Sequence, residues 1–183
     1  MKTVLQIKLL PDEIQHAALK DTMRVFNAAC NFIAEVAFRE QCASKFVLQK
    51  LVYDEVRKQF GLSAQLTIRA IAKVVEAYKR DKSKPCFFKP TGAVVYDQRI
   101  LSFKGLEAAS ILTLQCRLTV VMHMGDYQRV QFGRGHGQAD LVLVDGVFYL
   151  LLVIETPTAP PMDPKVFIGV DLGIVQIASD SDG

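Results

Sequence analysis

Apolar and polar side chains alternate at the start of the chain and then change to a helical spacing. Residues 2–9 follow the two-residue period of a half-buried strand. Pro11 ends that strand, and Asp12 and Glu13 supply the acidic first turn of a helix. The apolar positions that follow recur at helical spacing over 14–41. The sequence therefore opens with one strand and one long amphipathic helix.

Two further helices are predicted before residue 80. An apolar stripe over 46–60 indicates the second helix, which Gly61 ends. Ser63 is a suitable N-cap for a third helix that runs to about residue 79. Three consecutive helices thus separate the first strand from the rest of the chain.

Beyond residue 80 the pattern changes to short apolar runs separated by turn-forming residues. The predicted strands are 86–89, 94–96, 111–114, 118–122, 130–132, 141–144 and 147–154. Asp145 and Gly146, between two apolar runs, are a strong hairpin signal. Seven short strands with glycine-bearing turns indicate a small barrel or sandwich. The first strand is expected to join the same sheet, which makes the helices an insertion into a β-barrel.

A proline-rich linker precedes the motif that carries the clearest chemistry. Four prolines fall within 156–164, which predicts an extended segment. The apolar strand that follows, 166–174, carries Asp171 between Gly169 and Gly173. Burying an unpaired carboxylate is costly, so a cation should compensate it, and Mg²⁺ suits an all-oxygen site. A phosphate-contacting strand of the actin-like ATPases and a surface hairpin with a turn-capping aspartate are the alternatives for this motif.

Basic residues are concentrated near the middle of the chain. Residues 79–104 hold 7 Lys/Arg against 2 Asp/Glu, a net charge of +5, whereas the whole chain has a net charge of +3. We expect the cations to contact nucleic-acid phosphates, with a solvated interdomain loop as the alternative. The candidate contacts are Lys79, Arg80, Lys82, Lys84, Lys89 and Arg99. Phe87 and Phe88 lie among them, and burial in the barrel core is favoured for both over stacking on bases.

One polar face of the third predicted helix is a second candidate for nucleic-acid contact. Gln65, Arg69, Lys73, Glu76 and Arg80 recur at helical spacing along it. This face could contact the duplex beside a target, with Gln65 and Arg69 near base edges. The alternative is an exposed face on which Glu76 pairs with Lys73 and Arg80.

The cysteines and the hydropathy indicate what kind of protein this is and in which compartment it is expected. Half of the residues are hydrophobic, so the chain can bury a substantial core. The four cysteines form no CxxC pair, and neither a zinc site nor a disulfide framework is predicted. The sequence carries no secretory signal and no long apolar span. We therefore expect a reduced, cytoplasmic protein without a membrane partner.

The order of these segments resembles the N-terminal half of TnpB proteins, the RNA-guided nucleases of IS200/IS605 transposons, and of the related miniature type V CRISPR effectors. The resemblance covers essentially the whole chain and is weak in the strands of the barrel. It is carried by four segments: 26–32 (FNAACNF), 76–79 (EAYK), 96–103 (YDQRILSF) and 166–183, which contains GVDLGI and SDG.

The resemblance implies a specific α+β architecture and a division of labour. Residues 1–10 and 82–155 would form an OB-like wedge β-barrel, 11–81 an inserted helical recognition domain, 156–165 a linker and 166–183 the first hairpin of a ribonuclease-H-like RuvC domain. The wedge and RuvC domains would bind a guide RNA. The recognition and wedge domains would read a short motif beside the target in double-stranded DNA, while base pairing reads the rest.

The resemblance also implies that Asp171 is the first carboxylate of a Mg²⁺-dependent RuvC site. Such a site needs a glutamate and a second aspartate, and TnpB proteins usually carry a CxxC-type zinc element between them; none of these occurs up to Gly183. We therefore expect this chain to need the rest of the RuvC domain and to be inactive as a nuclease alone. A nuclease-dead RNA-guided repressor is the alternative, followed by an actin-like ATPase fragment.

Overall fold

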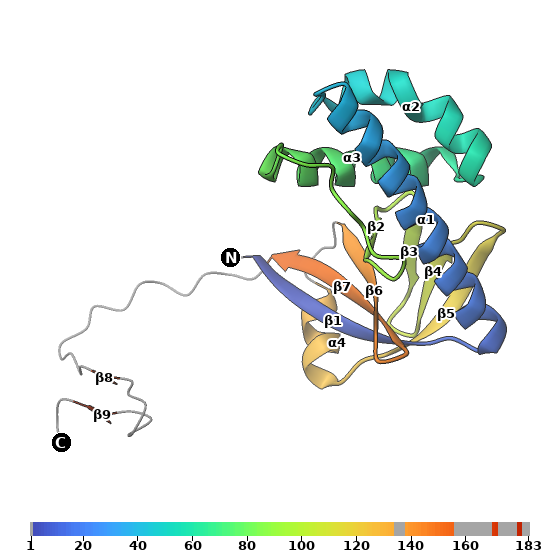
Figure 1. Cartoon of the computed structure of the whole chain (residues 1–183). Coiled ribbons are helices and arrows are strands. Elements are labelled where there is room, and N and C mark those ends of the chain that lie inside the picture. The colour runs from blue at the N-terminus through green and yellow to red at the C-terminus, as the bar shows by residue number, and fades with distance from the viewer. Residues whose placement is uncertain (1, 134–137, 156–169, 172–178, 181–183) are drawn as a thin grey trace.

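The computed structural model describes residues 2–133 and 138–155, together with the backbone of 170–171 and 179–180. A helical block stands beside a curled sheet (Figure 1). The helices are α1 (Glu13–Arg39), α2 (Lys45–Phe60), α3 (Ala64–Arg80) and α4 (Asp126–Phe132). The strands are β1 (Lys2–Leu10), β2 (Val94–Tyr96), β3 (Leu101–Lys104), β4 (Ala108–Leu112), β5 (Arg117–His123), β6 (Ala139–Val144), β7 (Val147–Glu155), β8 (Val170–Asp171) and β9 (Ser179–Asp180).

Capping residues mark the starts of α1 and α3 and the end of α2. Asp12 accepts a hydrogen bond from the Gln15 backbone nitrogen at 2.8 Å, and the Gln15 side chain returns to the Asp12 nitrogen, which completes a capping box on α1. Ser63 Oγ accepts from the Leu66 nitrogen at the start of α3. Gly61 ends α2 in the left-handed region at φ +64°. The predicted helices are therefore confirmed to within about two residues at each end.

Seven antiparallel strands form the main sheet, in the order β2-β6-β7-β1-β5-β4-β3. The first strand is central: Lys2–Lys8 pair with β7, and Lys8–Leu10 pair with β5. The expectation that β1 joins the later strands is thus confirmed, and α1 to α3 are an insertion between β1 and β2.

The connection between the two edge strands forces the sheet to curl. β2 ends at Tyr96 and β3 begins at Leu101, yet these strands lie at opposite edges of the sheet. Six strand spacings would separate the edges by about 29 Å in a flat sheet, whereas five Cα–Cα steps span at most about 19 Å. The sheet is therefore a half-barrel. The Tyr96 hydroxyl crosses its open side and donates to the Leu112 carbonyl oxygen on β4 at 2.9 Å.

The long helix α1 packs against both the sheet and the other two long helices. Near its start, Gln15 Nε2 donates to the Thr119 carbonyl oxygen of β5 at 3.1 Å, and His16 packs edge-on against Phe148 of β7. Its buried residues continue along the helix to Ala37, where the packing partners are α2 and α3. The inner face of the sheet and the helical block consequently share one hydrophobic core.

The Asp145-Gly146 hairpin and most strands are confirmed, but two predicted strands are wrong. Residues 86–89 form no strand, because prolines flank them and the side chain of Asn31 on α1 binds the Phe88 backbone. Residues 130–132 belong to α4, whose Gln128 side chain caps the Gly125 nitrogen at 3.0 Å. A three-residue apolar run does not distinguish a helix from a strand. The edge strand β3 was not among the predicted strands.

The C-terminal part of the chain is described only as a short backbone pairing. Val170 pairs with Asp180 and Asp171 with Ser179, antiparallel, in a separate two-stranded sheet. The predicted proline-rich linker, 156–165, and most of the predicted strand over 166–174 lie outside the described residues. In the described part of the chain, every helix is too short or too polar to cross a membrane.

Tyr96→Phe tests the bond across the open side of the half-barrel. Removing the hydroxyl leaves the ring in the core but removes a hydrogen bond, so the free energy of unfolding should fall by about 1 kcal/mol in urea titrations. Tyr127→Phe is the control, because Tyr127 is 63 % exposed on α4. Equal stability of Tyr96→Phe and wild type would show that this bond does not hold the edges together.

Candidate nucleic-acid interface

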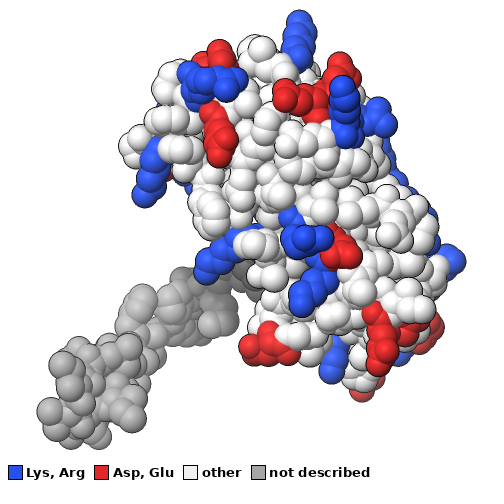
Figure 2. All heavy atoms as spheres, turned by 45° about the vertical axis from the view of Figure 1, so that its right-hand side comes forward, with Lys and Arg blue, Asp and Glu red and all other residues white. Residues whose placement is uncertain are grey.

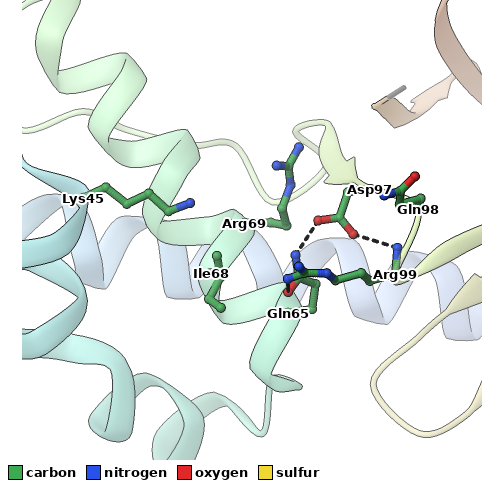
Figure 3. Close-up of a pocket in the computed structure, with 7 residues that line it drawn as sticks. All are labelled: Lys45, Gln65, Ile68, Arg69, Asp97, Gln98 and Arg99. Atoms are coloured by element: carbon green, nitrogen blue, oxygen red, sulfur yellow. Dashed lines mark hydrogen bonds between the residues drawn. The ribbon is translucent and has the colours of Figure 1, made fainter. Parts of the chain in front are cut away.

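A groove of about 440 Å³ lies between the helical block and the connection that joins the sheet edges (Figure 3). It is lined by Lys45, Gln65, Ile68, Arg69, Asp97, Gln98 and Arg99. Gln65 and Arg69 come from the first two turns of α3, whereas Arg99 comes from the 97–100 connection. The structure thus brings together candidate contacts from two separate segments: the polar face of the third predicted helix and the basic stretch that contains Arg99. Three cations against one carboxylate give the lining a net positive charge.

Asp97 fixes the wall of the groove. One of its carboxylate oxygens accepts from Gln65 Nε2, and the other accepts from the Arg99 backbone nitrogen at 3.0 Å. Arg99 Nη1 in turn donates to Gln65 Oε1 at 3.3 Å. The Gln65 amide is therefore oriented by two partners, while the Arg99 side chain remains exposed.

Arg69 lies between this groove and a charged cluster at the start of β6. Its Nη2 donates to Gln138 Oε1, whereas its Nε is buried without a partner among the described residues, as is Oδ1 of Asp140. Burial raises the pKa of Asp140, although Lys73 and Arg69 nearby oppose the shift. A cavity of about 10 Å³ beside Arg69 and Lys73 is comparable to the space for one water molecule.

Lys73 is held inside the fold. Its ammonium group donates to Asn27 Oδ1 at 3.0 Å and to the Ala93 carbonyl oxygen. It also lies 5.5 Å from the ring centre of Phe26 and 5.0 Å from that of Phe88. Burial lowers the pKa of Lys73. Its predicted contact with a nucleic-acid phosphate would require these internal bonds to break.

The alternative that Glu76 pairs with Lys73 and Arg80 is wrong for the described residues. The ion pairs found there are Arg24–Asp21, Arg39–Glu40 and Arg129–Glu107. The predicted polar face is in fact divided: Gln65, Arg69 and Lys73 are half-buried, whereas Glu76 and Arg80 are exposed. This division is caused by tertiary contacts with the sheet. The helical spacing of the sequence does not predict such contacts.

The basic segment, residues 79–89, is exposed and contains neither helix nor strand beyond Arg80. All five of its cations are exposed: Lys79, Arg80, Lys82, Lys84 and Lys89. Its one acidic residue, Asp81, accepts hydrogen bonds from the nitrogen and the hydroxyl of Ser83. On the face shown in Figure 2, Lys and Arg are interspersed with Asp and Glu.

The expectation that both phenylalanines of the basic segment lie in the core is half wrong. Phe88 packs against the core, but the side chain of Phe87 is 79 % exposed. The sequence pattern could not separate them, because the two residues are adjacent and chemically identical.

Two asparagines that sequence reasoning did not assign to the site hold the end of the basic segment. Asn31 Nδ2 donates to the Phe88 carbonyl oxygen at 2.9 Å, and its Oδ1 accepts from the Phe88 nitrogen at 2.7 Å. Asn27 Nδ2 donates to the Gly92 carbonyl oxygen at 2.7 Å. The asparagines are four residues apart on α1, Asn27 buried and Asn31 half-buried, beside a mainly apolar stripe. A polar side chain in such a stripe needs a partner, and that is the signal that could have identified them.

Asp171 lies in β8, where only its backbone pairing with Ser179 is described. Among the described residues, no group of three or more His, Cys, Asp and Glu side chains could hold a metal ion. No protein-family model matches the chain, and no curated protein matches it.

Asp140→Asn tests the electrostatics beside Arg69. The folded carboxyl keeps its proton to a higher pH than the ordinary value of 3.8, so its contribution to stability falls as the pH rises through that window. The variant lacks this titration. Its free energy of unfolding, minus that of wild type, should therefore increase from about pH 3 to neutral pH.

Urea titrations at several pH values measure this difference for Asp140→Asn. Asp54→Asn, on the exposed side of α2, controls for the loss of one negative charge. A difference that decreases with pH would mean that Arg69 and Lys73 stabilise the Asp140 carboxylate more than burial destabilises it.

Proposed function

We propose that the chain is the N-terminal half of an RNA-guided DNA endonuclease of the TnpB kind, which binds the guide RNA and reads a short motif beside the DNA target. The observation that carries the proposal is the convergence of Gln65, Arg69 and Arg99 in one basic groove. These residues were nominated from separate segments of the sequence, and they meet where the helical block joins the sheet.

The chemistry of the groove suits a DNA duplex. An arginine guanidinium pairs with the O6 and N7 acceptors of guanine, and a glutamine amide pairs with adenine in the major groove. Arg69 and Gln65 lie on consecutive turns of α3 and would supply these groups once duplex binding replaces their bonds to Gln138, Asp97 and Arg99. Arg99 and Lys45, on the opposite walls, are suited to phosphate contacts, which position a duplex but do not specify its sequence.

The architecture supports the finer domain assignment. In the proposal, the half-barrel of β1 to β7 is an OB-like wedge domain, and the block of α1, α2 and α3 is the recognition domain inserted after its first strand. The groove then lies at the boundary of the two domains that would read the motif. The exposed basic segment, which leaves the end of α3, would contact RNA phosphates.

Cleavage is the part of the proposal that depends on residues outside the described ones. Asp171 would be the first of three carboxylates that hold Mg²⁺ in the complete RuvC domain. A nuclease-dead RNA-guided repressor would use the same groove without the cleavage.

The first test is a motif-depletion screen with the complete protein that contains this chain. Arg69→Ala and Gln65→Ala should each relax the preference for one base beside the target, since a bidentate contact contributes about 1–3 kcal/mol of discrimination. Arg24→Ala is the control: Arg24 is exposed on α1 and lies outside the groove. Unchanged motif preference in both groove variants would show that this groove does not read DNA.

The second test concerns the basic segment. Replacing Lys82, Lys84 and Lys89 together with alanine should weaken RNA binding and reduce the slope of log affinity against log salt. The expected reduction is about 0.7 for each phosphate of a single-stranded RNA that the variant no longer neutralises. The matched control replaces Lys20, Lys50 and Lys58, which are also exposed and carry the same charge but lie on α1 and α2. Equal slopes for the two triple variants, measured by filter binding, would contradict an RNA contact at this segment.

A further inference from the structure

Phe87 is an exposed aromatic side chain next to a fixed backbone. Its side chain is 79 % exposed, whereas its neighbour Phe88 packs into the core. Asn31 binds both the nitrogen and the carbonyl oxygen of Phe88, at 2.7 and 2.9 Å. Two bonds from one side chain hold the backbone of Phe88 much as a neighbouring strand would. The residue that carries the exposed ring is thus joined directly to an anchored one.

Further bonds extend this anchor to residue 93. Asn27 Nδ2 binds the Gly92 carbonyl oxygen, and Lys73 binds the Ala93 carbonyl oxygen. A β-carbon at Gly92 would lie 3.0 Å from Asn27 Oδ1, so the chain passes close to α1 at this point. Side chains from α1 and α3 therefore fix the backbone on one side of Phe87.

Two lysines flank Phe87 in the sequence. Lys84 and Lys89 are within three residues of Phe87, a separation of at most about 11 Å along the chain. Both are exposed, and long lysine side chains can reach the phosphates that flank a base placed on the ring. Stacking on an aromatic face requires an unpaired base, which single-stranded RNA supplies. A protein partner fits less well, because lysine is depleted at protein–protein interfaces.

We propose that Phe87 is a stacking platform for an unpaired base of the bound RNA, and that Asn31 positions it by fixing the backbone of Phe88. The proposal rests on the proposed function, since it adds a base contact to the phosphate contacts of the basic segment. The ring makes the base contact, while Lys84 and Lys89 neutralise the adjoining phosphates.

The experiment uses a short single-stranded RNA that carries the fluorescent adenine analogue 2-aminopurine, and the same sequence as a duplex. Wild type should bind the single strand and quench the fluorophore. Phe87→Ala should weaken this binding by about five- to a hundredfold, lose the quenching and keep the salt slope, because it removes no cation. Phe87→Trp should restore both affinity and quenching, and duplex binding should be the same for all three proteins.

Tyr127→Ala is the matched control, since Tyr127 is an exposed aromatic residue on α4, outside the basic segment. It should bind and quench as wild type does. If Phe87→Ala binds and quenches like Tyr127→Ala, the stacking proposal is overturned, while RNA binding by the chain still stands. If wild type itself binds no RNA, the proposed function fails, and the stacking proposal fails with it.

Discussion

The four residues 97–100 connect the two edge strands of a seven-stranded sheet, and the rest of the structure depends on that connection. Because the link is too short to cross a flat sheet, the sheet must close into a half-barrel. The same link carries Asp97 and Arg99 against the start of α3, where Gln65 binds both. One covalent constraint therefore determines the shape of the sheet and forms one wall of the basic groove. The half-barrel brings the 97–100 connection against the start of α3, so the groove lies at the junction of the sheet and the helices.

Polar side chains inside the fold provide a second link between architecture and proposed function. Lys73, Asn27 and Asn31 are at least half-buried, and each directs its hydrogen-bonding groups to the backbone or side chains near residues 88–93. Buried polar groups whose hydrogen bonds are all made hold the segment that they bind in one defined position. The basic segment is consequently irregular but anchored at one end, which suits a surface that must present cations and a ring to a nucleic acid.

The sequence predicted the elements that neighbouring residues determine. Asp12 and Glu13, predicted as an acidic first turn, and the predicted cap Ser63 placed the starts of two helices. Asp145-Gly146 placed a hairpin in which both residues adopt positive φ. The sequence did not predict the elements whose conformation depends on contacts between residues far apart in the chain. Residues 86–89 look like a strand, but their hydrogen-bond partner is Asn31, about 57 positions away in the sequence. Gln65, Arg69 and Arg99 were named in two separate segments as nucleic-acid contacts, which stays a prediction. Their convergence in one groove depends on the 97–100 connection, which no periodicity reveals. The role of Asp171 lies outside the described side chains and stays a prediction.

The central claim is that the chain binds a guide RNA, and co-purification tests it most directly. The gene would be expressed with its native flanking DNA, the protein isolated under native conditions, and the bound RNA sequenced. The account predicts one discrete RNA species with a constant scaffold and a variable guide at its end. A well-folded protein that carries no enriched RNA would contradict guide-RNA binding and leave the basic segment, residues 79–89, without its proposed partner.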